Sequence, residues 1–155
     1  MASKSRTNPQ TLFADLVRCE TRLYNELNDW LRERHGIVTS QYEFLRYLHA
    51  HPGARVGDLA GEFAIGIGST SKSIDRLERH GWVARQPNPD DRRSSLLVLT
   101  TEGTRLIDAA ERTVAGRLTE LIGGTLDAAK TSAVATALAQ LRTALEADQI
   151  GLPTG

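Results

Sequence analysis

Apolar residues recur every three or four positions over most of the chain, and glycine or proline interrupts this pattern at intervals. Such a period is typical of helices that bury one face, and the interruptions indicate where the helices end. The pattern predicts six helices, at about 9–35, 40–51, 56–63, 67–80, 100–122 and 127–147. We expect Gly36 to end the first helix, and two adjacent glycines, 123 and 124, to separate the last two.

Polar residues stand where several of these helices begin. Ser40 is followed three positions later by Glu43, which is the form of a capping box, so we expect Ser40 to cap the second helix. Thr100 and Asp127 are the expected caps of the last two helices.

The period changes from helical to alternating after Gly81. Residues 82–85 and 95–99 favour two short strands, and the polar segment 86–93 is the loop between them. A loop of this length is longer than a tight turn and is typical of a segment that reaches a partner. The order of three helices, a fourth helix and a hairpin predicts a winged helix-turn-helix, a mainly α fold with a small β-hairpin wing.

The fourth helix has two distinct faces. Thr70, Ile74 and Leu77 form its expected inward face. The opposite face carries polar and basic residues at the spacing that places side chains together: Ser69, Lys72, Ser73 and Arg76. A helix of this kind fits the major groove of DNA.

Composition limits the class of protein. The chain has 155 residues, 19 basic and 19 acidic, with 40% hydrophobic residues, which is ordinary for a single folded domain. Segment 66–93 carries 6 basic and 4 acidic residues, whereas 1–65 carries 8 of each and 94–155 carries 5 and 7. No apolar run is long enough for a membrane span, and the polar start is followed by no signal-peptide core, so we expect a cytoplasmic protein. One cysteine excludes an intramolecular disulfide.

Several motifs resemble the multiple-antibiotic-resistance regulator (MarR) family. They are Leu59-Ala60, the run from Ser73 to Gly81, Val83-x-Arg85, Asp90-Asp-Arg-Arg93 and Leu99-Thr-x-x-Gly103. The resemblance covers roughly residues 10–147. It implies one MarR-type domain over 1–155, with dimerisation helices at 10–35 and 101–147 around a winged helix-turn-helix core at 38–100.

The resemblance also implies a function and a partner. A homodimer would bind double-stranded DNA at a pseudo-palindromic operator, act as a repressor and be released by a small aromatic or phenolic acid. The DNA-binding roles carried over from the family fall on the fourth helix and the wing, at Ser69, Ser71, Lys72, Ser73, Arg76, Asp91, Arg92 and Arg93. In the wing, we expect the Asp91 carboxylate to hold the Arg93 guanidinium so that it enters the minor groove.

The chain departs from the family pattern at the start of the fourth helix. Gly66 stands where a side-chain cap is common, Thr70 fills a position that is usually apolar, and Ile67-Gly68 replaces residues that are often polar. These differences leave the fold intact and make the base contacts uncertain to assign.

The effector site is predicted by residue type alone. An aromatic acid needs a cation and an apolar wall, and the candidate lining residues are Tyr24, Trp30, His35, Tyr42, Arg46 and His49. The four histidines form no metal-ligand spacing with a cysteine or carboxylate pair, so neither a metal site nor a cofactor is expected.

Two alternative functions remain open at this stage. Cys19 lies in the first helix, where peroxide-sensing members of the family keep a reactive thiol, so a thiol-based redox protein is one. Tyr24 is out of register for activating Cys19, and the adjacent Glu20 disfavours a thiolate, which favours a buried structural thiol. The other is a protein-interaction module on a degenerate winged fold. No catalytic motif is present, so we expect no enzyme.

Overall fold

A computed structural model of the chain describes residues 7–154. Residues 1–6, the polar start considered for a signal peptide, lie outside this range. Six helices and one hairpin follow in the order α1 (Pro9–His35), α2 (Thr39–Ala50), α3 (Val56–Glu62), α4 (Ile67–Arg79), β1 (Val83–Pro87), β2 (Ser95–Leu99), α5 (Thr101–Gly123) and α6 (Ala128–Ala147). The mainly helical winged fold is therefore confirmed.

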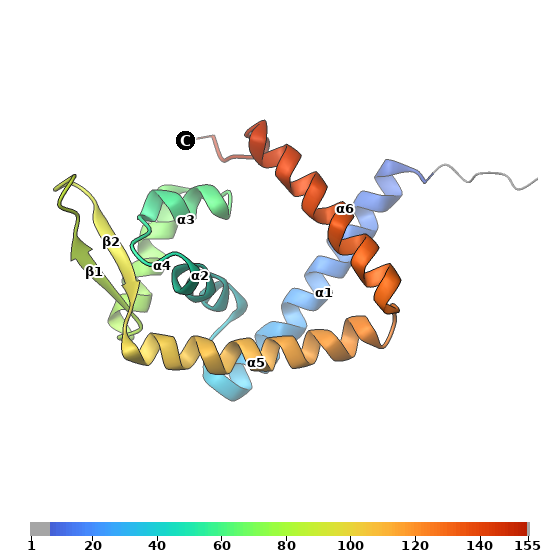
Figure 1. Cartoon of the computed structure of the whole chain (residues 1–155), viewed down its shortest axis with the longest axis horizontal. Helices are drawn as coiled ribbons and strands as arrows, with labels where there is room; N and C mark the ends of the chain where they lie inside the picture. Colours follow the sequence, from blue (N-terminus) through green and yellow to red (C-terminus); the bar gives the residue numbers. More distant parts are fainter. Residues whose placement is uncertain (1–6, 155) are drawn as a thin grey trace, which may run out of the picture.

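The molecule has a globular end and an open end (Figure 1). Helices α2, α3 and α4 and the hairpin pack together at one end, and α5 runs along the molecule. At the other end α1 extends outward, and α6 turns back from the far end of α5 toward the middle of the molecule. Within the described part of the chain, no helix combines the length and apolar character that crossing a membrane requires.

The core lies inside the winged end. Its fully buried side chains come from all the packed elements and include Leu31, Leu45, Leu59, Ile74, Leu97 and Ile107. Burial of this set removes the largest apolar side chains of the central segments from water, which is the main favourable term in folding. The C-terminal half of α1 and the first half of α5 contribute to this core, so both helices belong partly to the winged end.

The ends of the helices show which capping signals are local. Gly36 adopts the left-handed conformation (φ 68°) that ends α1. Thr100 Oγ1 accepts a hydrogen bond from Gly103 N (3.0 Å), and Asp127 Oδ1 accepts one from Lys130 N (2.8 Å), as expected. These caps depend on neighbours within three residues, so the sequence predicts them well.

The prediction that Ser40 caps α2 is wrong. The helix begins at Thr39, and Gln41 Oε1 accepts a hydrogen bond from Val38 N (3.0 Å). Asn28 of α1 supplies a further acceptor, because its Oδ1 accepts from Thr39 N (2.7 Å). A side chain from another helix thus satisfies an N–H group that a local cap would otherwise satisfy.

The hairpin pairs β1 and β2 in antiparallel register, from Val83 opposite Leu99 to Pro87 opposite Ser95. Strand β1 begins one residue later and ends two residues later than predicted, so it is one residue longer, and the loop lies at residues 88–94. Strand β1 includes Pro87 at its end. Proline has no backbone N–H, but it is tolerated there because the last position of an edge strand requires no N–H donor. A single bridge between Ala54 and Leu97 fastens the hairpin to the turn after α2.

Candidate nucleic-acid interface

Helix α4 places its two faces as the sequence predicts. Thr70, Ile74 and Leu77 are fully buried, and the hydroxyl of Thr70 donates to Gly66 O (2.9 Å). The polar hydroxyl in an otherwise apolar position is therefore satisfied within the helix. On the other side of α4, Ser69, Lys72 and Arg76 are exposed and Ser73 is half-buried, whereas Ser71 is half-buried beside the inward face.

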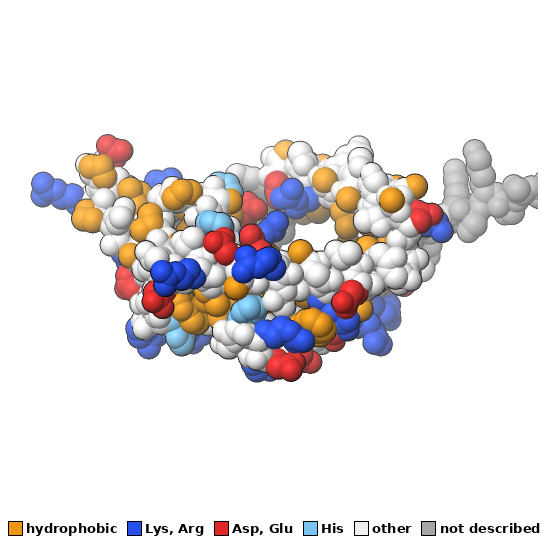
Figure 2. All heavy atoms as spheres, turned by 60° about the horizontal axis from the view of Figure 1, so that its bottom comes forward, with side chains coloured by type: hydrophobic (Ala, Val, Ile, Leu, Met, Phe, Trp, Pro, Cys, Tyr) orange, Lys and Arg blue, Asp and Glu red, His pale blue; other side chains and the backbone are white. Residues whose placement is uncertain are grey.

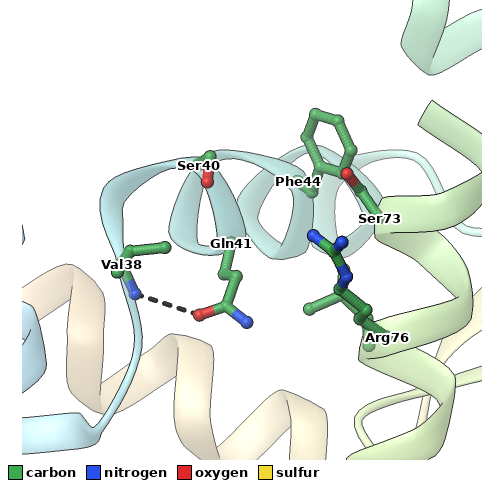
Figure 3. A pocket seen from close by; sticks show the side chains of 7 residues that line it. Val38, Ser40, Gln41, Phe44, Ser73 and Arg76 are labelled. Atoms are coloured by element: carbon green, nitrogen blue, oxygen red, sulfur yellow. Dashed lines mark hydrogen bonds between the residues drawn. The ribbon is translucent and has the colours of Figure 1, made fainter. Parts of the chain in front are cut away.

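The basic face of α4 borders a shallow notch against α2. The notch is lined by residues from both helices: Val38, Ser40, Gln41, Phe44, Ser73, Arg76 and Leu77. Figure 3 shows the Arg76 side chain extending from α4 toward α2 in this notch. Among the described residues, Arg76 forms no ion pair, and the two carboxylates of α4, Asp75 and Glu78, pair with Arg85 instead.

Arg85 has a role that the sequence analysis missed. From strand β1 it contacts both acidic groups of α4, with Nη1 2.8 Å from Asp75 Oδ1 and 3.2 Å from Glu78 Oε1. These carboxylates would otherwise repel a phosphate backbone near the helix. The signal for this contact is weak in the sequence, because it needs the register of a strand against a helix seven or more residues away.

The wing loop is organised by Asn88, a second residue that the sequence analysis missed. Asn88 is buried, its Nδ2 donates to Ser94 Oγ (3.0 Å), and its Oδ1 accepts from Asp90 N (3.0 Å). These two bonds fix both sides of the loop at its base. The loop can then hold its tip away from the body of the molecule without a long unpaired segment.

The prediction that Asp91 holds the Arg93 guanidinium is wrong for this conformation. Asp91 Oδ1 accepts from the backbone N–H of Arg93 (2.9 Å), so the carboxylate shapes the turn instead. Asp91, Arg92 and Arg93 are all exposed. Lys and Arg side chains stand at the wing end of the molecule in Figure 2.

The start of α4 has backbone N–H groups without a side-chain cap. Gly66 is the N-cap residue and accepts from Thr70 N (3.0 Å) through its carbonyl, but it has no side chain to bond the first turn. Uncapped N–H groups at a helix start favour an anion such as a phosphate. The start of α4 and the tip of the wing loop are therefore both exposed, outside the core of the winged end.

The residues predicted to line an effector site do not gather in one pocket. The guanidinium groups of Arg34 and Arg117 lie over the Trp30 ring, 3.7 Å and 4.7 Å from its centre. Tyr42 is buried, and its burial raises the pKa of the phenol. Tyr24 is half-buried in α1, where its backbone carbonyl accepts from Thr39 Oγ1 (3.2 Å).

The remaining effector candidates form ion pairs between α2 and α5. Arg46 Nε lies 3.6 Å from Glu111 Oε1, and His49 Nε2 lies 3.8 Å from Asp108 Oδ1. The ligand-type atoms of His49, Asp108 and Glu111 lie within 4.8 Å of one another, which corrects the expectation that no histidine meets a carboxylate pair. All three donors are solvent-accessible, and Arg46 already supplies a positive charge to Glu111, so we assign the group as an ion-pair cluster.

His35 contacts α5 instead of a ligand pocket. Its Nε2 lies 2.7 Å from Thr113 Oγ1, and burial, with the nearby Arg34 and Arg112, lowers the pKa of the imidazole. The neutral ring is therefore favoured in the folded protein.

Cys19 is exposed, so the expectation of a buried thiol is wrong for the single chain. It lies in the N-terminal part of α1, outside the core. Exposure makes the thiol accessible, but a sensor also needs neighbours that stabilise a thiolate, and the adjacent residue is Glu20, which accepts from Thr21 Oγ1 (3.3 Å).

Comparison with known proteins agrees with this geometry. Residues 37–95 match the model of the MarR family. Over 88 residues the chain is 30% identical to the multiple antibiotic resistance protein MarR of Escherichia coli, an alignment that covers 57% of this chain and 60% of that protein. The chain thus matches about half to three fifths of the length of such curated relatives.

Solved structures share the fold over nearly the whole chain. The transcriptional repressor CouR bound to a 23-mer DNA duplex is 27% identical, with a TM-score of 0.76 over 92% of this chain and 99% of that chain. Sco3205 of Streptomyces coelicolor, a MarR family regulator in complex with DNA, is 21% identical, with a TM-score of 0.82 over 99% of this chain and 98% of that chain. Segment 37–95 is thus similar to the MarR family, and the fold of the chain is the one seen in solved MarR-family regulators.

Proposed function

We propose that the chain is a transcriptional regulator that binds double-stranded DNA as a homodimer, with α4 in the major groove and the wing loop in the minor groove. The observation that carries this proposal is the separation of charge on α4. Lys72 and Arg76 are exposed, whereas Asp75 and Glu78 are engaged by Arg85. The arrangement leaves cations free for phosphates or guanine edges while Arg85 offsets part of the negative charge of the nearby acids.

Dimer formation is supported by the apolar residues at the open end. Leu12, Phe13, Leu16 and Val17 of α1 are exposed, as are Val134, Leu138, Leu141 and Leu145 of α6. Leu16 and the α6 leucines line one shared hollow, and Figure 2 shows hydrophobic side chains collected on this arm. A continuous apolar surface of this kind marks an interface, and residues 10–35 and 101–147 are the proposed dimerisation helices.

Two-fold pairing determines the form of the DNA site. Two copies of α4 related by a two-fold axis fit a pseudo-palindromic operator whose half-sites are centred about one helical turn, roughly 34–36 Å, apart. The proposed contacts with DNA are those of Ser69, Ser71, Lys72, Ser73 and Arg76 on α4 and of Arg92 and Arg93 on the wing, which Asp91 shapes.

We propose that the chain represses transcription by binding DNA in the cytoplasm. A small aromatic acid would release it from the DNA. The proposal assigns the chain no catalytic role. The dispersed positions of Tyr24, Trp30, Tyr42, Arg46 and His49 do not support one preformed effector pocket. They do place Arg46 and His49 at the junction of the winged core with α5, where a bound anion would compete with Glu111 and Asp108.

Selection of bound fragments from the source genome, followed by salt titration of the binding constant, tests the proposal. We expect a pseudo-palindromic site bound by two chains, with an affinity that falls steeply as salt increases. Arg93→Ala should weaken binding to all duplexes and reduce the salt slope by about one phosphate contact. Arg112→Ala, which removes the same charge from an exposed site on α5, is the matched control.

Absence of binding to any duplex at low salt would contradict the proposal as a whole. A slope that is the same for Arg93→Ala and for the unmodified chain would remove the wing from the DNA contact. Addition of a panel of phenolic acids to the complex tests the effector, because a ligand of the DNA-free form must lower the apparent affinity for DNA.

A further inference from the structure

Ile67 is an apolar residue that the core and the dimer surface leave unexplained. Its side chain is 66% exposed. In the described part of the chain, the other large hydrophobic residues with high exposure all lie between residues 12 and 17 or between 134 and 152, on α1, on α6 and on the segment after α6. Ile67 lies on α4, outside these segments.

The position of Ile67 is fixed by its neighbours in the turn and the helix. It is the first residue of α4, which places it at the tip of the helix. Ile65, two residues earlier, packs against the core, and its N–H donates to Ala60 O (3.0 Å). Thr70, one turn later, is fully buried. By the helical period Ile67 falls on the same side of α4 as Thr70 and Ile74, but it stands one turn before Thr70, where it protrudes from the tip of the helix beyond the core.

Glycines flank Ile67 at positions 66 and 68, although neither the available space nor the backbone conformation there requires a glycine. A Cβ added at Gly66 or at Gly68 would meet no atom within 4 Å. Gly66 has φ −65° and ψ 144°, a conformation that any residue adopts. Glycine is also a poor helix former, so Gly68 weakens the first turn of α4. Bare backbone here is useful when another molecule approaches closely.

We propose that Ile67 contacts the 5-methyl group of a thymine in the major groove and thereby helps to select the sequence of each half-site. This inference rests on the proposed function of α4 as the helix that enters the groove. Residues at the start of such a helix reach the base edges. The thymine methyl is the apolar group that the major-groove edges present, and an isoleucine can neither donate to a phosphate nor bond a polar base edge.

The test uses duplexes that the chain itself selects from a random pool. Each thymine of the selected site is replaced in turn by deoxyuridine, which differs from thymidine only in lacking the methyl group. For the unmodified chain we expect the dissociation constant to rise about fourfold at one thymine in each half-site, and about fifteenfold when both are replaced, from the free energy of burying one methyl-sized group per site.

Ile67→Ala provides the second side of a double-variant cycle, which cancels any change in the duplex itself. This variant should bind the thymine duplex more weakly and bind the thymine and deoxyuridine duplexes equally well. Ile67→Leu, which keeps a branched apolar side chain, should retain most of the discrimination. Thermal unfolding of both variants should match that of the unmodified chain, because the exposed side chain contributes little to the core.

The outcomes separate this inference from the proposed function. If the chain binds a selected duplex but no deoxyuridine replacement weakens binding, or if Ile67→Ala keeps the full discrimination, the assignment of Ile67 is wrong and the DNA-binding function stands. If the chain selects no duplex at all, the proposed function and this inference both fail.

Discussion

The winged core and the helical arms of this molecule treat apolar side chains in opposite ways. In the core, leucines such as Leu45 and Leu59 are fully buried against neighbours from the same chain. In the arms, Phe13 is 67% exposed and Leu141 is 48% exposed, although both have helical spacing as regular as that of the core residues. The difference teaches that one region completes its packing within the chain, whereas the other needs a second surface.

The same contrast separates the glycines of α5. Gly103 lies at the core end, where an added Cβ would come 2.0 Å from Trp82 O. Gly116 lies further along the helix, and a Cβ there would meet nothing within 4 Å. Helix α5 thus has one glycine that close packing requires, near its start, and another with open space around it further along.

The largest effect is expected from a charge in the arm. Leu141→Glu should weaken chain pairing by about a thousandfold, because about 4 kcal/mol is lost when two leucines leave an interface and two carboxylates enter it. Sedimentation equilibrium measures the dissociation constant. Thr136→Glu on the other side of α6 is the matched control, and equal effects of the two changes would show that the leucine stripe is not the interface.

A comparably large effect on the core is expected from Gly103→Ala. The new methyl group must displace the backbone of Trp82, so the free energy of unfolding should fall by about 3 kcal/mol. Gly116→Ala should leave it unchanged or raise it by up to about 1 kcal/mol, since alanine favours the helix. Chemical denaturation measures both variants, and a stable Gly103→Ala protein would contradict the close packing of α5 against the hairpin.

A smaller and more selective effect is expected from Arg85→Gln. The change leaves Asp75 and Glu78 unneutralised on α4, so affinity for DNA should fall roughly tenfold through repulsion of the phosphates. Stability should change by less than about 1 kcal/mol, because the ion pairs are partly exposed. Anisotropy titration with a selected duplex measures the affinity, and Asp75→Asn added to this variant should recover part of it. A fall in stability without a fall in affinity would assign Arg85 a purely structural role.

The smallest effect concerns His35, at the end of α1, whose ring contacts Thr113 of α5. Its pKa in the folded protein is lowered from 6.5 by burial and by Arg34 and Arg112. The unfolded chain therefore binds the proton more readily, and the contribution to stability that is present above pH 6.5 should be lost as pH falls through the folded pKa. Denaturation between pH 7.5 and about 5 should show this slope. His35→Gln removes the titrating group, and an identical slope in that variant would assign the pH dependence to other residues.

The fold was predictable because its signals are local. The end of α1 at Gly36 and the caps at Thr100 and Asp127 each depend on residues within one turn. The inward face of α4 follows from its period alone. The start of α2 was misplaced because Asn28, distant in sequence, bonds Thr39 N. A contact across helices leaves no pattern in a single sequence.

The candidate site was predictable only in part, for the same physical reason. Motif spacing identifies the wing arginines and the basic side of α4. The ion pairs of Arg85 and the bonds of Asn88 depend on three-dimensional placement, and so do the real partners of Arg46 and His49. Cys19 was expected to be a buried structural thiol because Tyr24 is out of register for activating it and Glu20 is adjacent, but the arm that carries it leaves it exposed in the described part of the chain.

The spacing of half-sites tests the central claim most directly, because paired arms hold the two α4 helices at a fixed separation. Affinity is measured for a selected operator and for versions in which the half-sites are moved apart by half a helical turn or by a full turn. We expect the half-turn insertion, about five base pairs, to reduce affinity by two orders of magnitude or more, since the second α4 then faces the wrong side of the duplex. Equal affinity for all three duplexes would contradict the claim that the exposed arms join two reading helices in one rigid dimer.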